Sequence, residues 1–128
     1  MRLPIQINEQ SAEPLYHQIE VQLRALIVSG QLAEGTLLPS IREMAQTVKC
    51  SVITVKRVYG DLEAEGLLRT RQGTGTYVAH VGEQERDRFR LAAVIEALEQ
   101  AVTAGLRVQC TQEELTELFK EALKNHYK

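Results

Sequence analysis

Hydroxyl and cationic side chains, rather than nucleophile–base pairs, are the residues of this 128-residue chain whose spacing indicates chemistry. Ser40 and Ser51 each stand directly before a stretch with helical character, and the cations Arg42 and Lys56 follow them closely. A hydroxyl at the start of a helix and a nearby cation are both suited to hold a phosphate oxygen. The pattern therefore favours binding of a polyanion over catalysis.

Enzymatic and metal-binding functions lack their usual residue patterns. The three histidines, His17, His80 and His126, are scattered, and no Cys or His pair has the spacing of metal ligands. The Gly-Thr-Gly-Thr turn at 73–76 lacks the Gly-Lys-Ser/Thr of a phosphate loop. We therefore expect no catalytic residue, no metal and no cofactor, and we expect Cys50 and Cys110 to be reduced thiols.

The charge distribution is compatible with nucleic acid although the chain as a whole has a net charge of −2. Residues 40–80 carry six Lys or Arg against four Asp or Glu, so the basic groups concentrate there. Local patches, not the total charge, determine the attraction to phosphate. No apolar run approaches membrane-spanning length and the start does not resemble a signal peptide, so we expect a cytoplasmic protein that does not bind membranes.

A helix-turn-helix is predicted where the candidate residues lie. Ser40 and Glu43 form the S-x-x-E pattern of a capping box, so a helix is expected to begin at Ile41. After about two turns Ser51 provides a second N-cap, and the next helix is expected to end just before Gly66. Two short strands should follow at 67–71 and 76–78, around a glycine-bearing turn.

Helix, turn, helix and β-hairpin in this order indicate a winged helix-turn-helix, a fold that reads DNA. Its second helix is expected to leave Val52 and Ile53 exposed at the first turn, which is unusual for β-branched apolar residues on a solvated face. Two interpretations are open. Either these side chains cover the corner of the domain, or their methyl groups meet thymine methyls in the major groove.

The residues upstream predict one more helix and an arm. Pro14 favours the first helical position, and apolar residues then recur at helical spacing from Leu15 to Ile27. Residues 1–12 look like a flexible arm. The arm either packs loosely, as an ordered tail, on the core of its own chain or crosses to a partner subunit.

The remainder predicts a linker at 80–85 and two amphipathic helices, the first ending at Gly105 and the second beginning at a capping box of Thr111 and Glu114. Two such helices cannot bury both apolar stripes by themselves, so we expect them to pair with the same hairpin of a second chain. The alternative is packing on the first helix of their own chain. The residues expected at the dimer interface are Leu91, Val94, Ile95, Leu98, Val102, Leu115, Leu118, Phe119 and Leu123.

From about Pro14 to Val78 the chain resembles the GntR family of bacterial transcription regulators, in register and without a gap. The short helical remainder is similar to the YtrA-type subfamily. The matching residues are Pro14, Leu15, Tyr16, Gln18, Ile19, Leu23, Arg24, Ile27, Gly30, Gln31, Leu32, Gly35, Leu38, Pro39, Ser40, Arg42, Glu43, Ala45, Thr54, Val55, Tyr59, Leu62, Glu63, Glu65, Gly66, Gly73, Gly75, Thr76, Tyr77 and Val78.

The residues and the resemblance together give candidates for contacts with double-stranded DNA. Arg42 matches an arginine of the family that can reach a base edge or a phosphate, with a local ion pair as the alternative. Ser40 and Ser51 are structural caps in either case, and Arg57 is equally well explained as a solvated charge. The candidates are Ser40, Arg42, Ser51, Val52, Ile53, Thr54, Lys56, Arg57, Arg69, Arg71, Gln72, Gly73 and Gly75.

Two features qualify these candidates. The family usually carries an arginine after the N-cap serine, where this chain has Val52, so direct readout of guanine at that position is out of reach. The glycines Gly73 and Gly75 would let the tip of the wing approach DNA closely, although a turn requirement explains them nearly as well.

We therefore expect a mostly α-helical fold with a small β wing. Residues 1–79, with the arm 1–12, would form the winged helix-turn-helix, and 80–128 the linker and a helical dimerisation region. The resemblance implies a homodimeric, sequence-specific DNA-binding regulator of an inverted-repeat operator, a repressor rather than an activator, and suggests transporter genes as its target. The alternative is a winged helix that acts through protein or RNA contacts. The operator, the regulated genes and any small-molecule effector do not follow from the sequence.

Overall fold

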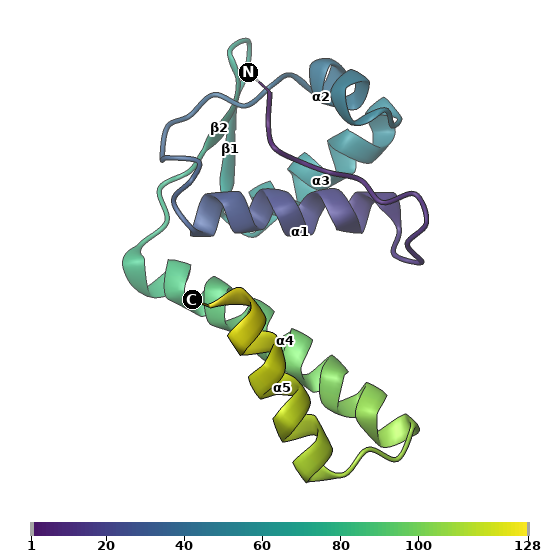
Figure 1. Ribbon diagram of the computed structural model, residues 1–128. Coiled ribbons are helices and arrows are strands. Elements are labelled where there is room, and N and C mark those ends of the chain that lie inside the picture. The colour runs from purple at the N-terminus through teal and green to yellow at the C-terminus, as the bar shows by residue number, and fades with distance from the viewer. Residues whose placement is uncertain (1, 128) are drawn as a thin grey trace. The chain divides into compact units, whose positions relative to one another are not determined.

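The computed structural model describes residues 2–127 and divides into two compact units, Met1–Arg90 and Leu91–Lys128. The expected fold class, mostly α-helical with a small β wing, is confirmed (Figure 1). In chain order the elements are α1 (Leu15–Val28), α2 (Ile41–Val48), α3 (Val52–Ala64), β1 (Leu68–Arg71), β2 (Gly75–Val78), α4 (Glu83–Arg107) and α5 (Gln112–His126).

The core of the first unit forms where α1, α2, α3 and the start of the wing meet. Burial of each large aliphatic side chain stabilises the fold by roughly 1.5–3 kcal/mol, and α3 is the helix that contacts α1, α2 and the first strand of the wing. The core thereby fixes α3, the second helix of the helix-turn-helix, on α1. The largest fully buried side chains are Ile19, Leu23, Met44, Val55, Val58, Leu62, Leu67 and Leu68.

Local signals set the ends of the helix-turn-helix as predicted. Ser40 Oγ accepts a hydrogen bond from Glu43 N at 3.1 Å, and Ser40 N donates to Glu43 Oε1 at 3.0 Å, which completes the capping box. The Ser40 N–H, and then its hydroxyl, lowers the pKa of the Glu43 carboxyl. Lys49 ends α2 in the left-handed conformation, with φ of 57°, and Ser51 then caps α3 by accepting from Thr54 N.

The wing is a two-stranded antiparallel sheet in which Leu68 lies opposite Val78 and Arg71 opposite Gly75. An isolated bridge between Leu37 and Tyr77 extends it by one position. Gly75 has φ of 135°, and a Cβ there would lie 2.9 Å from Leu37 Cδ1. The positive φ therefore favours a glycine at this position, as the turn interpretation of the sequence held, while the end of the exposed Leu37 side chain could shift.

The N-terminal arm lies on the core of its own chain (Figure 1). Leu3 is only 6% exposed and is part of the core, while Ile5 and Ile7 pack against it. The expectation of a flexible arm is wrong for this segment, because burial of alternate aliphatic side chains ties it down. It packs more tightly than the loose tail that the sequence suggested.

Two glutamines one helical turn apart on α1 hold the backbone of the arm. Gln22 accepts from Gln6 N at 2.8 Å and donates to Gln6 O at 2.6 Å. Gln18 accepts from Asn8 N at 2.9 Å and donates to Asn8 O at 3.1 Å. The two amides thus replace the partner strand that an extended segment would otherwise need.

Helix α4 begins at Glu83, inside the predicted linker, and continues past Gly105, so both predicted limits of this helix are wrong. Acidic residues in its first turn favour a helix N-terminus, although no apolar periodicity marks that turn. Phe89, near its start, packs against the core of the first unit. The compact first unit therefore includes the start of α4 up to Arg90. The division into functional regions at 79 stays a prediction.

The second unit is a hairpin of α4 and α5. The predicted capping box begins α5, with Thr111 N donating to Glu114 Oε1 at 2.8 Å and Glu114 N donating to Thr111 Oγ1 at 3.1 Å. Gly105 faces Leu115, whose Cδ2 would lie 2.8 Å from an added Cβ, so the helices touch there. Eight of the nine predicted interface side chains are 41–61% exposed, and Leu115 is half-buried.

Among the residues described, none of the helices is both long and apolar enough to cross a membrane.

Candidate nucleic-acid interface

Both helix starts of the helix-turn-helix present a hydroxyl hydrogen in addition to their capping oxygens. Ser40 Oγ and Ser51 Oγ accept backbone hydrogen bonds at 3.1 Å each. Ser51 Oγ also lies 2.8 Å from Thr54 Oγ1, so these two hydroxyls share one hydrogen and keep another. Capping therefore leaves a donor at each helix start that can serve a phosphate oxygen.

Arg42 is exposed in the first turn of α2. Within residues 2–127 its side chain forms no ion pair or hydrogen bond, so the local ion pair considered as an alternative is not formed. A cation at a helix N-terminus opposes the helix dipole by about 0.3–1 kcal/mol, and α2 therefore gains nothing from this residue. An anion outside the chain is the partner that this position suits.

The start of α2 is anchored to α3 by a buried hydroxyl. Tyr59, 4% exposed, donates to Pro39 O at 2.8 Å. Burial, and secondly the charge of Glu43, raises the pKa of the Tyr59 hydroxyl, which therefore stays protonated and able to donate. The bond fixes the position of the Ser40–Arg42 segment relative to α3.

The first turn of α3 exposes the two apolar residues singled out from the sequence. Ile53 is 80% exposed and Val52 49%, so Ile53 covers almost none of the domain corner. Lys56 is exposed on the same helix, whereas Thr54 is half-buried beside Ser51. The start of α3 thus exposes methyl groups and a cation on the surface of the first unit.

The wing separates its side chains by face. Thr70 Oγ1 donates a hydrogen bond to Glu63 Oε1 of α3 at 3.2 Å, so Thr70 belongs to the face of the wing that packs on α3. Because side chains alternate along a strand, Arg69 and Arg71 project from the opposite face. Arg71 lies over the Tyr77 ring there, with its guanidinium carbon 5.8 Å from the ring centroid.

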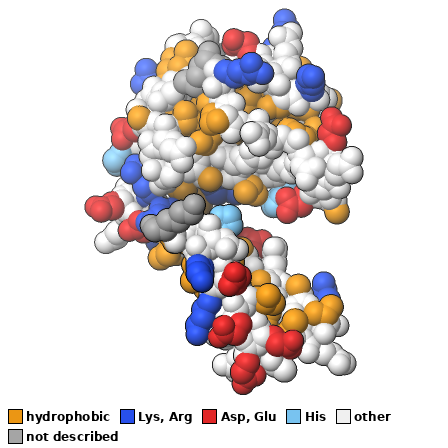
Figure 2. Space-filling view, in the orientation of Figure 1, with side chains coloured by type: hydrophobic (Ala, Val, Ile, Leu, Met, Phe, Trp, Pro, Cys, Tyr) orange, Lys and Arg blue, Asp and Glu red, His pale blue; other side chains and the backbone are white. Residues whose placement is uncertain are grey.

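The tip of the wing holds Gln72 and Gly73, both exposed. Gly73 has φ of 82° and open space where a Cβ would stand, so it is required by the turn and not by packing. Figure 2 shows basic side chains near the wing and α2, interspersed with hydrophobic ones. These features together give the first unit a polar and basic edge.

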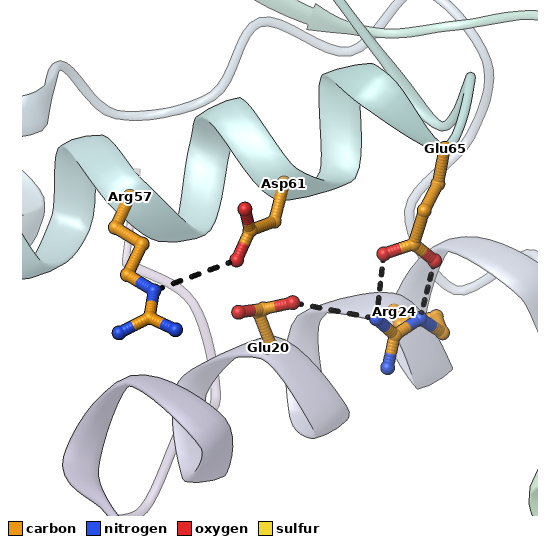
Figure 3. A network of polar contacts seen from close by, with 5 residues as sticks. All are labelled: Glu20, Arg24, Arg57, Asp61 and Glu65. Atoms are coloured by element: carbon orange, nitrogen blue, oxygen red, sulfur yellow. Dashed lines mark hydrogen bonds and ion pairs between the residues drawn. The ribbon is translucent and has the colours of Figure 1, made fainter.

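Arg57 differs from the other candidate cations. Its guanidinium carbon lies 3.5 Å from the centroid of the Tyr16 ring in α1, and its Nε lies 3.8 Å from Asp61 Oδ2. Figure 3 shows it turned toward Asp61 and α1. The structure therefore gives Arg57 partners on its own chain, and neither sequence interpretation, DNA contact or solvated charge, anticipated them.

Sequence reasoning did not predict that the Tyr16 ring would be the platform for Arg57. It also did not predict that Glu20 and Asp61 would form an acidic pair beside it. The spacing of Glu20 and Arg24 at i and i+4 was a visible signal of a helix-surface ion pair. Nothing in the sequence places Asp61 opposite Glu20, because that proximity depends on the packing of α3 on α1.

Comparison with known proteins bears on this site. The profile described as "Bacterial regulatory proteins, gntR family" matches residues 15–78. The chain is 32% identical over 117 residues to the HTH-type transcriptional repressor YtrA of Bacillus subtilis (strain 168), which covers 91% of this chain and 90% of that protein.

Two solved structures are similar to the chain. A transcriptional antiterminator from Listeria monocytogenes EGD-e has a TM-score of 0.73 at 28% identity, over 95% of this chain and 91% of that one. AraR(DBD) in complex with operator ORX1 has a TM-score of 0.54 at 28% identity, over 62% of this chain and 99% of that one.

A helix-turn-helix with a basic wing, on the fold of a domain solved with its operator, defines a DNA-binding transcription regulator rather than an enzyme. The chain belongs to the GntR family of bacterial regulatory proteins, which confirms the resemblance seen in its sequence.

Proposed function

We propose that the protein is a homodimeric repressor that acts in the cytoplasm by binding an inverted-repeat operator. The observation that carries this proposal is the exposed set of Arg42, Ile53 and Lys56 beside the basic wing. The name of the Bacillus relative, a transcriptional repressor, supports the direction of regulation.

The second copy is needed because one winged helix reads only a few base pairs. A genome offers about 10⁶ or more competing sites, which is too many for so short a sequence. Two heads related by a two-fold axis double the site, with half-sites about one helical turn or a multiple apart. The exposed apolar stripes of α4 and α5 supply a surface for this pairing, and Figure 2 shows hydrophobic side chains of the second unit at its surface.

In this proposal the exposed residues make different kinds of contact with DNA. Arg42 reaches a base edge or a phosphate, and the hydroxyls of Ser40, Ser51 and Thr54 hold phosphates at the helix starts. Lys56, Arg69 and Arg71 add charge along the backbone, and Gln72 with Gly73 brings the tip of the wing close to a groove. Gly75 contributes through the shape of the wing.

Selection of bound sites from random duplexes tests the proposal. We expect an inverted repeat to be enriched, and its affinity to fall steeply and linearly in log–log form as salt rises. Enrichment without two-fold symmetry would contradict the homodimeric reading. Affinity that does not change with salt concentration, or a preference for RNA over duplex DNA, would instead favour a winged helix that acts through protein or RNA contacts.

Val52 and Ile53 are expected to read thymine methyl groups. Replacing single thymines of the selected operator by uracil removes only those methyls, and each lost contact should weaken binding about fourfold, since one buried methyl-sized group is worth roughly 0.8 kcal/mol. Fluorescence anisotropy with each substituted duplex measures the effect. If every uracil-substituted operator binds like the parent, the two side chains do not read thymine.

The neighbouring cations Lys56 and Arg57 form a matched pair for a salt test. Lys56→Ala should reduce the slope of log affinity against log salt by about 0.9, the value for one phosphate contact. Arg57→Ala should leave the slope unchanged and cost about 0.5–1 kcal/mol of folding stability through the lost contact with the Tyr16 ring. Equal changes of slope in both variants would place Arg57 on the phosphate backbone as well.

A further inference from the structure

A polar cluster joins α1 to the recognition helix, here called the α1–α3 seam: Tyr16, Glu20 and Arg24 from α1 with Arg57, Asp61 and Glu65 from α3. Arg24 binds Glu65 through two hydrogen bonds of 2.9 and 2.7 Å and reaches Glu20 at 3.4 Å. In Figure 3 the carboxyl groups of Glu20 and Asp61 face each other, with Arg57 on one side of them and Arg24 on the other. Two acids therefore meet at the centre of the seam.

The charges of the seam do not balance when every group is ionised. Three carboxylates, Glu20, Asp61 and Glu65, face two guanidinium groups, Arg24 and Arg57, which leaves one negative charge in excess. Only 10% of the Glu20 side chain is exposed, so water cannot compensate for this charge well. One proton on the acidic pair makes the seam neutral.

Several groups act on the ionisation of Glu20. Burial, then the hydrogen bond and charge of Asp61, raises the pKa of Glu20 from 4.5 to about 7, while Arg24 lowers it and Glu65 raises it. Because the Glu20 carboxyl is hydrogen-bonded to Asp61, a proton on Glu20 lies between the two carboxyl groups.

We propose that Glu20 and Asp61 share one proton, and that this proton holds the recognition helix α3 against α1. In the protonated pair, one carboxyl donates a hydrogen bond to the other, and Asp61 remains a partner for Arg57 Nε. Loss of the proton leaves two carboxylates in contact, and their repulsion pushes α3 away from α1. Glu20 and Asp61 are thus positioning residues for a helix whose own side chains meet DNA.

The direction of the pH effect follows from proton binding. Between the ordinary pKa of a glutamate and the raised pKa of Glu20, the folded protein holds a proton that the unfolded chain has lost. Folding stability must therefore fall as pH rises through this window. Groups whose pKa is lowered by folding, such as Glu43, act in the opposite direction.

Urea unfolding of the full chain across this window tests the shared proton. From about pH 5 to about pH 8, the unfolding equilibrium constant of the parent should rise by on the order of 100-fold relative to Glu20→Gln. The amide of the variant keeps the hydrogen bond to Asp61 without titrating, so the two proteins should be similar at the acidic end, diverge as pH rises toward about 7, and run nearly parallel above it. Parallel profiles would overturn the proposal.

Asp61→Asn separates a shared proton from simple burial of Glu20. A shared proton requires that neutralising either member flattens the profile, and that the double variant flattens it no further. If only Glu20→Gln has this effect, Glu20 titrates alone and the pair is not shared. Glu63→Gln is the matched control, because Glu63 lies on the same helix but hydrogen-bonds to Thr70 in the wing, and its profile should run parallel to that of the parent.

The effect of the proton on the position of α3 is tested by binding to the selected operator. This experiment rests on the proposed function. The affinity of the parent should fall more steeply than that of Glu20→Gln between about pH 6 and about pH 8, since proton and operator favour the same position of α3. Parallel losses would show that the seam does not act on DNA binding, and that part of the proposal would fail. Absence of operator binding at every pH would contradict the proposed function instead, and the unfolding profiles would still decide on the proton.

Discussion

Leu98→Asp is expected to convert a dimer into a folded monomer and to remove tight operator binding. Leu98 is 41% exposed in the single chain, so an aspartate there remains solvated in the monomer and leaves the first unit intact. In a paired hairpin the same carboxylate would be buried without a partner, at a cost of several kcal/mol. Each 1.4 kcal/mol is a factor of ten, so the dimer dissociation constant should rise by about 100-fold or more.

Phe119→Asp, on α5, should act in the same way, because Phe119 is 51% exposed and belongs to the other stripe. Gln100→Asp is the matched control. It introduces the same charge on α4 but lies about 200° around the helix from Leu98, away from the stripe. Sedimentation velocity at micromolar concentration and anisotropy with the operator measure both effects. A monomeric variant with the operator affinity of the parent, or a monomeric parent protein, would contradict the paired hairpin.

The helix-turn-helix and the wing could be predicted from the sequence because their limits depend on local interactions. Ser40 and Ser51 begin helices through hydrogen bonds to residues three positions further on. Gly73 permits a backbone conformation that side chains disfavour. Each of these signals lies within a few residues of its effect, so a reading of the sequence can find it.

The start of α4 and the course of the arm could not be predicted in this way. Charged residues fill the first turns of α4, where ion pairs such as Arg88 with Glu85 at 3.0 Å replace an apolar face. Burial of Phe89 then depends on the core of the first unit. The arm likewise depends on Gln18 and Gln22. Glutamine is a common surface residue, so the sequence does not show that these two amides bind the backbone of the arm in the folded chain.

The candidate site shows the same division. Exposure of Ile53 and of Arg42 follows from helical position and was predictable. The fate of Arg57 was not, since its partner Tyr16 is far away in sequence and is brought near by the α1–α3 packing. Sequence reasoning could identify Arg57 as a cation on the recognition helix but could not say which way its side chain turns.

Arg42→Ala is expected to weaken operator binding by roughly 1–3 kcal/mol if the guanidinium reads a base edge. The fold should not change, because within the described residues the side chain has no partner to lose and its charge opposes the dipole of α2. Gln46→Ala, at an exposed position one turn later on α2, is the control and should bind like the parent. Circular dichroism verifies the fold and anisotropy measures the affinity.

Arg42→Lys then distinguishes the two contacts that the position allows. Lysine keeps the charge but lacks the planar pair of donors that matches a guanine edge. If Arg42 reads a base, Lys should restore little of the affinity, and the loss should concentrate at one base pair when operator variants are compared. If it holds a phosphate, Lys should restore most of the affinity, and Arg42→Ala should weaken binding evenly across sequences and reduce the salt slope by about 1. An alanine variant that binds the operator as tightly as the parent would remove Arg42 from the interface.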